Sequence, residues 1–213
     1  GRRFFKSNRV VTNGTILLPN WPDVEFHVSV DGTEKLHDSI RGEGCYEKIK
    51  KNIPDSKNSH LNIALACCLN KMNLDCVDDL INEWRAVPHI KHILFDFFTP
   101  ISGVKEGIGF SFSERDIAIE KLIKLKQKFG DFIGGPPKTF DFMREKNHHS
   151  ATGKNCVFVK NGTSFDAWGN IKKPCVIGPK ADCGRCGCIV PFSVRAWKTP
   201  SNLLREVWKE IRR

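Results

Sequence analysis

Nine cysteines in a chain of 213 residues constrain this protein more than any other feature of its sequence. The number is odd, and a chain of this length can bury an ordinary hydrophobic core without disulfides to stabilise it. Five of the nine fall within residues 156–188, and these are Cys156, Cys175, Cys183, Cys186 and Cys188. In a reducing compartment such a cluster favours metal ligation over disulfide bonding, so we expect a cytoplasmic, metal-binding protein.

The spacing within this window predicts how the thiols meet. The window ends in Cys-Gly-Arg-Cys-Gly-Cys, where one tight turn can direct the two thiolates of a Cys-X2-Cys pair at the same metal. Cys156 and Cys175 flank a segment with turn signals at Asn161-Gly162 and at residues 166–169. A hairpin there would return both thiols to the same turn, with Cys188 as a substitute ligand or a spare thiol.

Four thiolates can hold structural zinc or an iron–sulfur cluster, and the ligand set alone does not separate the two. On the window alone zinc comes first, an iron–sulfur cluster second, and disulfides or uncommitted thiols third. Basic residues near the window would offset the charge of either thiolate centre, and these are Lys172, Lys173, Lys180 and Arg185. The window therefore predicts a metal and leaves the element open.

Upstream of residue 130 the chain alternates between strand-like and helix-like patterns. Apolar runs typical of buried strands occupy residues 9–12, 24–30, 61–67 and 92–98. Apolar residues recur at helical spacing in residues 46–53, 75–84 and 113–129, and Ser113 and Asp116 have capping-box spacing. This alternation predicts an α/β fold of about four βα units, too few for a closed eight-fold barrel.

The pattern changes after Gly134-Gly135-Pro136-Pro137. We expect an α/β domain over residues 1–134 and a small cysteine-rich module over residues 135–213. An amphipathic helix from Ser201 is expected to close that module.

Charge and hydropathy exclude several classes of protein. The formal net charge is +10, and no apolar stretch approaches the roughly 18 residues that a membrane span requires. The charged start of the sequence is not followed by the long apolar run of a secretory leader. We therefore expect no membrane span. The charge favours anionic partners or cofactors, but the basic residues lack the interleaved aromatic side chains typical of nucleic-acid binding.

Two segments of the front half resemble radical S-adenosylmethionine (SAM) enzymes. The stretch Ser29-Val-Asp31-Gly32, followed by His37-Asp38 and Arg41-Gly42, is similar to the fourth strand and following loop of that family. The run Val11-Thr-Asn-Gly-Thr15 is similar to its third strand. This resemblance implies the C-terminal portion of a partial (β/α)6 radical SAM barrel over residues 1–134.

The cysteine window resembles the start of the SPASM or shorter twitch extension of the same family. Twelve residues separate Cys156 from Gly169, and five separate Gly169 from Cys175, one more than the family pattern. The window also lacks the full seven-cysteine series. The resemblance implies a twitch-like module with one auxiliary [4Fe–4S] cluster, held by cysteines among Cys156, Cys175, Cys183, Cys186 and Cys188.

The resemblance implies an activity for a longer polypeptide. Such an enzyme would cleave SAM reductively to methionine and a 5′-deoxyadenosyl radical that acts on a substrate, here unknown, with electrons from a reductant such as ferredoxin or flavodoxin. No Cys-X3-Cys-X2-Cys triplet for the catalytic cluster is present, and the chain begins at the expected third strand. We therefore expect a C-terminal fragment, inactive alone. The alternative is a non-catalytic zinc-binding α/β module.

Carried over by position, four residues would line the SAM cavity. Ser29 and Asp31 would hydrogen-bond SAM or shape its pocket, Arg41 would meet a carboxylate through paired N–H donors, and Asn62 would reach the ribose. Simpler interpretations are a turn at Asp31-Gly32 and an ion pair between Arg41 and Glu43.

The remaining candidates have plainer interpretations. His37, His148 and His149 lack a partner at ligand spacing, so we interpret them as solvated loop residues. Asp96 and Thr99 end a strand and are candidates for substrate contact. The four cysteines outside the window are expected to be small core residues, and these are Cys45, Cys67, Cys68 and Cys76.

Overall fold

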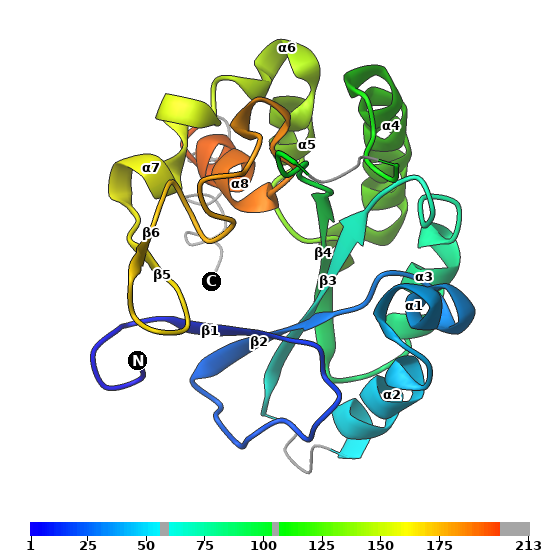
Figure 1. Cartoon of the computed structure of the whole chain (residues 1–213). Coiled ribbons are helices and arrows are strands. Elements are labelled where there is room, and N and C mark those ends of the chain that lie inside the picture. The colour runs from blue at the N-terminus through cyan, green and yellow to red at the C-terminus, as the bar shows by residue number, and fades with distance from the viewer. Residues whose placement is uncertain (56–59, 104–106, 201–213) are drawn as a thin grey trace. The chain divides into compact units, whose positions relative to one another are not determined.

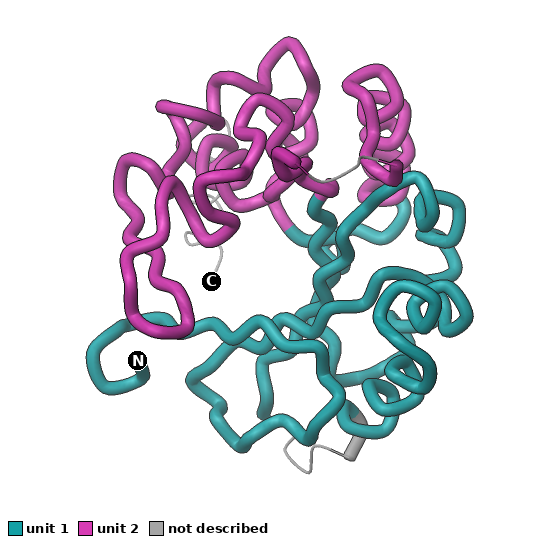
Figure 2. The backbone as a smooth tube through the Cα atoms, in the orientation of Figure 1, with its two compact units in different colours: residues 1–96, 128–134 teal, residues 97–127, 135–213 magenta. Residues whose placement is uncertain are grey.

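The computed structural model describes residues 1–55, 60–103 and 107–200 (Figure 1). The helix expected from Ser201 lies outside the described residues. The chain forms two compact units: residues 1–96 with 128–134, and residues 97–127 with 135–213 (Figure 2). In the part of the chain that the structure describes, no helix is both long and apolar enough to cross a membrane.

The first unit contains a four-stranded sheet. Its strands are β1 (Asn8–Thr12), β2 (Val24–Ser29), β3 (Asn62–Leu69) and β4 (Ile90–Phe97), in the order β1-β2-β3-β4. Strands β1 and β2 pair in parallel, as do β2 and β3. All four expected strands are confirmed to within two or three residues, because continuous apolar runs suit strands of a covered parallel sheet.

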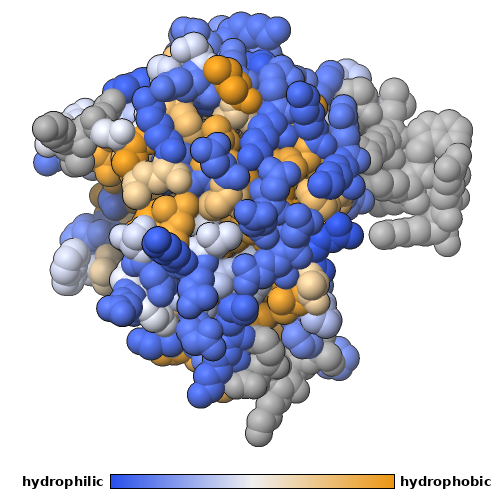
Figure 3. Space-filling view, turned by 90° about the vertical axis from the view of Figure 1, so that its right-hand side faces the viewer, coloured by the Kyte–Doolittle hydropathy of each residue, from blue (hydrophilic) through white to orange (hydrophobic). Residues whose placement is uncertain are grey.

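Three helices lie on one side of this sheet: α1 (Glu34–Arg41), α2 (Cys45–Asp55) and α3 (Val77–Trp84) (Figure 1). Phe26 and Val28 of β2 are buried, as are Ile49 of α2 and Trp84 of α3. Hydrophilic side chains cover much of the face shown in Figure 3, as expected of helices with an apolar side toward a sheet. Helix α1 falls in a segment that the sequence predicts as a loop.

Asp38 connects α1 to the start of α2. One carboxylate oxygen accepts a hydrogen bond from the backbone N–H of Gly44 at 2.8 Å, and the other accepts from Tyr46 at 2.9 Å. Asp38 thus caps the amino end of α2 from outside that helix. These backbone hydrogen bonds, the one from Tyr46 above all, lower the pKa of Asp38 below its usual value.

We expect this cap to make stability depend on pH in the acid range. Because the folded-state pKa is below the unfolded value of about 3.9, the contribution is present above that pH. It is lost as pH falls through the folded-state pKa. Asp38→Asn should flatten this part of the acid-unfolding profile followed by circular dichroism. Asp131→Asn, at an exposed position, is the control, and identical profiles for both variants would contradict the assignment.

The second unit contains mainly short helices. They are α4 (Phe112–Phe129, whose last two residues belong to the first unit), α5 (Lys138–Met143), α6 (Glu145–His148), α7 (Val157–Asn161) and α8 (Ile189–Trp197). Single 3-10 turns are η1 (Gly130–Phe132, in the first unit), η2 (Gly153–Asn155) and η3 (Cys183–Arg185). Strands β5 (Ser164–Phe165) and β6 (Ile171–Lys172) pair as an antiparallel hairpin. Phe140 of α5 and Phe192 of α8 are fully buried.

Helix α4 begins one residue before the expected start. Its capping box is formed by Ser111 and Glu114: the Ser111 N–H donates to the Glu114 carboxylate at 2.8 Å, and the Glu114 N–H donates to the Ser111 hydroxyl at 3.3 Å. The expected pair, Ser113 and Asp116, is wrong. Both pairs have the same spacing, but only Ser111 lies outside the helix, where a cap must be.

Candidate functional site

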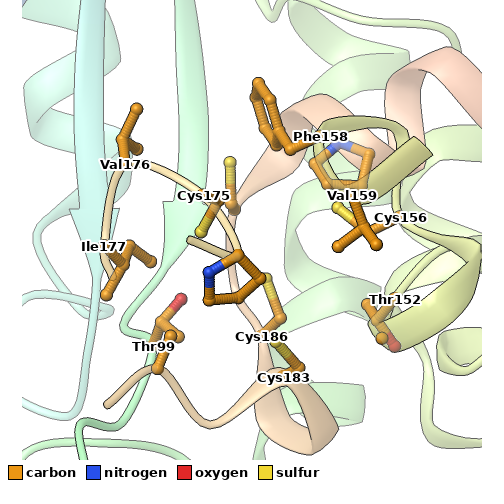
Figure 4. A pocket seen from close by; sticks show the side chains of 15 residues that line it. Thr99, Thr152, Cys156, Phe158, Val159, Cys175, Val176, Ile177, Cys183 and Cys186 are labelled. Atoms are coloured by element: carbon orange, nitrogen blue, oxygen red, sulfur yellow. The ribbon is translucent and has the colours of Figure 1, made fainter. Parts of the chain in front are cut away.

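All five clustered cysteines line one cavity in the second unit. Figure 4 labels four of them, Cys156, Cys175, Cys183 and Cys186, and Cys188 lies in the same lining. The cavity itself has a volume of about 30 Å³, and the space between its lining atoms reaches about 460 Å³ when its open mouth is included. The rest of the wall is largely apolar, with contributions from Phe158, Val159, Pro174, Val176, Ile177 and Pro191.

A hairpin separates the first two thiols, as the sequence predicts. Strands β5 and β6 are joined by a turn in which the Asp166 carboxylate accepts hydrogen bonds from the backbone N–H groups of Trp168 and Asn170, both at 2.9 Å. Cys156 immediately precedes α7, and Cys175 follows β6 by three residues. The turn is therefore the one at residues 166–169, and not the one at Asn161-Gly162.

The Cys-X2-Cys pair occupies the short turn η3. Asp182 caps this turn, since its carboxylate accepts from the N–H groups of Gly184 at 2.9 Å and Arg185 at 3.3 Å. The same carboxylate accepts from the Arg185 guanidinium at 2.8 Å. Cys183 thus opens the turn and Cys186 ends it, and both thiols line the same cavity.

Gly187 fixes this turn against the end of β4. Its N–H donates to the Thr99 hydroxyl at 2.8 Å, and its carbonyl accepts from the Phe97 N–H at 2.8 Å. A Cβ at this position would lie 1.9 Å from the Phe97 carbonyl oxygen, which no side chain could tolerate. Glycine is required here for the close backbone approach, and its φ is not in the left-handed region.

A buried arginine also holds the turn. Arg115 of α4 donates to the carbonyl oxygens of Cys186 at 3.0 Å and Arg185 at 2.8 Å, and its guanidinium lies over the rings of Phe97 and Phe112. Burial lowers the pKa of Arg115 to about 10, so the group is still charged at neutral pH. Within the described residues, no carboxylate forms an ion pair with it. A buried cation bonded to the backbone of the turn that carries Cys186 favours an anionic centre nearby.

His148 makes a second contact to the same turn. Its Nε2 lies 2.7 Å from the Cys186 carbonyl oxygen, its Nδ1 lies 3.3 Å from the Thr152 hydroxyl, and its ring packs against Phe112 and Phe192. The interpretation of His148 as a solvated loop residue is therefore wrong. His37 is also completely buried, in α1, and its Nδ1 accepts from the Asp31 N–H at 3.2 Å. Of the three histidines, only His149 is exposed.

The thiols influence one another electrostatically. Burial raises the pKa of Cys186 to about 11, and it also raises the pKa of Cys183, with further increases from nearby Cys175 and Cys156. Cys183 and Cys186 would both be neutral at neutral pH without a cation to favour their ionised forms. Within the described residues, no three cysteine sulfurs lie within 4.8 Å of one another.

A second group of candidates lies where β2 ends, in the first unit. The Asp31 carboxylate accepts from the Arg41 guanidinium at 2.6 Å and from the Cys68 N–H on β3 at 3.0 Å. The Asp31 carbonyl accepts from the Asn73 amide at 3.0 Å. Asp31 therefore connects β2 to β3 and orients Arg41. The carboxylate that pairs with Arg41 is that of Asp31, and not that of Glu43 as the simpler interpretation expected.

Asn62 lies away from this group. Asn62 is the first residue of β3 and pairs in register with Glu25, whereas Ser29 pairs with Ala66. Four residues of strand separate the two positions, or roughly 13 Å. The structure thus brings Ser29, Asp31 and Arg41 to one end of the sheet and places Asn62 near the other.

Several residues that hold the turn with Cys183 and Cys186 were not identified from the sequence. Arg115 has a detectable signal, because it occupies the buried stripe of α4, where an apolar residue would be expected. Asp182 precedes Cys183 as a capping residue would, but the carbonyl contacts of His148 carry no local signal. Among the four cysteines expected in the core, only Cys67 is fully buried, while Cys45, Cys68 and Cys76 are partly exposed.

Comparisons with known proteins identify a fold and no family. No protein-family model and no curated protein sequence matches this chain. Two matching solved structures are "Native anSMEcpe with bound AdoMet and Kp18Cys peptide" (TM-score 0.56, 16% identity) and "Native anSMEcpe with bound AdoMet" (TM-score 0.57, 15% identity). Each alignment covers 92% of this chain, but only 58% and 57% of those chains, so this chain spans little more than half their length.

Proposed function

We propose that this chain is the C-terminal part of a radical SAM enzyme and that the thiol-lined cavity holds an auxiliary [4Fe–4S] cluster. One observation carries the proposal: five cysteines from three separate segments, at residues 156, 175 and 183–188, line a single cavity. The fold similarity to chains that bind AdoMet supports the partial (β/α)6 barrel. The assignment to the radical SAM family rests on the sequence motifs around Asp31 and Gly169.

The donor set fits an iron–sulfur cluster. Thiolates are the usual ligands of such clusters, and the cavity supplies one more than the four that a [4Fe–4S] cluster requires. A tetrahedral zinc site with Zn–S bonds of about 2.3 Å would place its sulfurs about 3.8 Å apart. Within the described residues no three cysteine sulfurs lie within 4.8 Å of one another, an arrangement that suits a cluster, whose sulfurs each bind a different iron.

The surrounding residues would hold and tune this centre. Arg115 would offset part of its negative charge, while Asp182, Thr99 and His148 fix the backbone that presents Cys183 and Cys186. The apolar wall would exclude water. A bound cluster would supply one-electron chemistry.

The Asp31 group would form part of a SAM pocket. Asp31 would be a positioning residue. Its carboxylate would hold the Arg41 guanidinium at the carboxyl end of the sheet, where ligands of parallel α/β folds bind. Arg41 would then meet a carboxylate, and Ser29 would line the pocket. The reductant, ferredoxin or flavodoxin, and the unknown substrate belong to the activity of the longer enzyme.

Anaerobic reconstitution with iron and sulfide tests the cavity assignment. We expect about four iron and four sulfide per chain, with broad visible absorption, and less iron after oxygen exposure. Zinc analysis is the parallel measurement. Stoichiometric zinc that iron and sulfide do not displace would reject the cluster and favour the non-catalytic zinc-binding module.

A further inference from the structure

Two histidines and a glutamate converge in the first unit, apart from the residues used above. The Nε2 of His27 lies 3.3 Å from one carboxylate oxygen of Glu25, and the Nε2 of His92 lies 3.9 Å from the other. A ligand atom of each of the three lies within 4.8 Å of the other two. Within the described residues this is the one group of His, Cys, Asp and Glu side chains with that geometry.

Strand register explains the convergence. Glu25 and His27 are two residues apart on β2, so both side chains project from the same face of the sheet. His92 is on β4, and β3 separates the two strands. The β3 residue paired with His27 is Ala64, whose methyl group leaves room for the two imidazoles to approach, with ring centroids 6.5 Å apart.

A glycine makes room for the third ligand. Gly134 donates its N–H to the Ile93 carbonyl at 2.8 Å, which brings its backbone beside β4. A Cβ on Gly134 would lie 2.9 Å from the His92 ring and 2.5 Å from the Leu94 side chain. The absence of a side chain at residue 134 therefore permits the position of His92.

The glutamate is oriented and one histidine nitrogen is unsatisfied. Arg9, the register partner of Glu25 on β1, donates to one carboxylate oxygen at 2.7 Å. The other oxygen faces His92. His27 is 5% exposed, and its Nε2 has no aligned hydrogen-bond partner among the described residues although Glu25 is nearby. A buried nitrogen in this state requires an explanation.

We propose that Glu25, His27 and His92 form a binding site for a divalent transition metal of the zinc class. Two imidazoles and one carboxylate are an established ligand set for zinc and leave its fourth position open. Tetrahedral zinc bonds of about 2.05 Å place two ligand atoms about 3.4 Å apart. The Nε2 of His27 lies 3.3 Å from one Glu25 oxygen and the Nε2 of His92 lies 3.9 Å from the other, so a bound ion would face both carboxylate oxygens. Arg9 is the positioning residue for the carboxylate.

The site is open to ions and chemically distinct from the thiol cavity. The Glu25 and His92 side chains are 19% and 26% exposed, so an ion can reach the ligands from solvent. All three donors are nitrogen or oxygen, whereas the cavity in the second unit offers sulfur. The inference therefore stands or falls independently of the proposed iron–sulfur cluster.

Zinc titration of the full chain tests the site, with Zn²⁺ alone as the probe. The variants are His92→Gln and Glu25→Gln, and His89→Gln is the matched control because it lies outside the cluster on the same unit. Wild type and the three variants keep the same cysteines, so any zinc bound by thiols is equal in all four proteins and cancels in the comparison. We expect wild type and His89→Gln to bind one more zinc per chain than His92→Gln, and Glu25→Gln to bind the extra zinc at least tenfold more weakly.

Selective ¹⁵N labelling of histidine supplies the second measurement. Zinc should shift the Nε2 resonances of two histidines, out of seven in wild type and six in His89→Gln. Neither shift should occur in His92→Gln, whose folding is checked by circular dichroism. Equal zinc stoichiometry in wild type, His89→Gln and His92→Gln, or zinc binding without a shift at two Nε2 atoms, would overturn the proposal.

Discussion

Replacing Cys183 and Cys186 by serine is expected to reduce the iron bound after anaerobic reconstitution from about four atoms per chain to fewer than one. Both thiols belong to one turn, so their loss leaves two of the four proposed irons without a protein ligand. Serine keeps the shape of the side chain but is a poor ligand for iron. Iron and sulfide analysis, with the visible spectrum, measures the loss.

Two controls make this result specific. Cys45→Ser removes a thiol that lies outside the cavity and should retain about four iron per chain. Cys188→Ser should behave in the same way if Cys156 and Cys175 complete the ligand set, because a fifth thiol is not needed. If the double variant retained the full cluster, the iron would have to be bound elsewhere, and the cavity assignment would be abandoned.

Arg115→Met is expected to lower the free energy of unfolding by about 2–3 kcal/mol. The variant loses two charge-assisted hydrogen bonds, to the carbonyls of Cys186 and Arg185, and keeps much of the packing against the aromatic rings. Relief of the desolvation of a buried cation offsets part of the loss. The urea midpoint should fall by about 1 M for a slope of 2–3 kcal/mol per molar.

The same variant should bind its cluster less firmly, because the turn that presents Cys186 is no longer fixed and a compensating charge is removed. Arg144→Met is the matched control, since Arg144 pairs only with the exposed carboxylates of Asp116, Glu120 and Asp141 among the described residues, and it should cost at most about 1 kcal/mol. Arg115→Lys should recover part of the charge effect but not the paired hydrogen bonds. Equal urea midpoints for Arg115→Met and Arg144→Met would show that Arg115 does not hold the turn.

Local pattern was sufficient where one segment determines its own structure. The apolar runs that became β2, β3 and β4 are long and bounded by turn residues, so their strands could be predicted to within a few residues. The hairpin between Cys156 and Cys175 could also be predicted, because its turn depends on the local residues 166–170. Helix α1 has a clear amphipathic pattern, so a helix could have been predicted where the family resemblance implied a loop.

The sequence by itself determined which chemistry the chain can offer, because the types and spacing of Cys183, Cys186 and the hairpin cysteines define a thiol ligand set before any folding. Only the tertiary structure decided which residues far apart in the chain come together at each site. Arg115 and His148 reach the Cys186 carbonyl from other helices, and His92 reaches His27 across β3. Such contacts depend on helix packing and strand register, which place residues far apart in the chain side by side and leave no mark in local spacing.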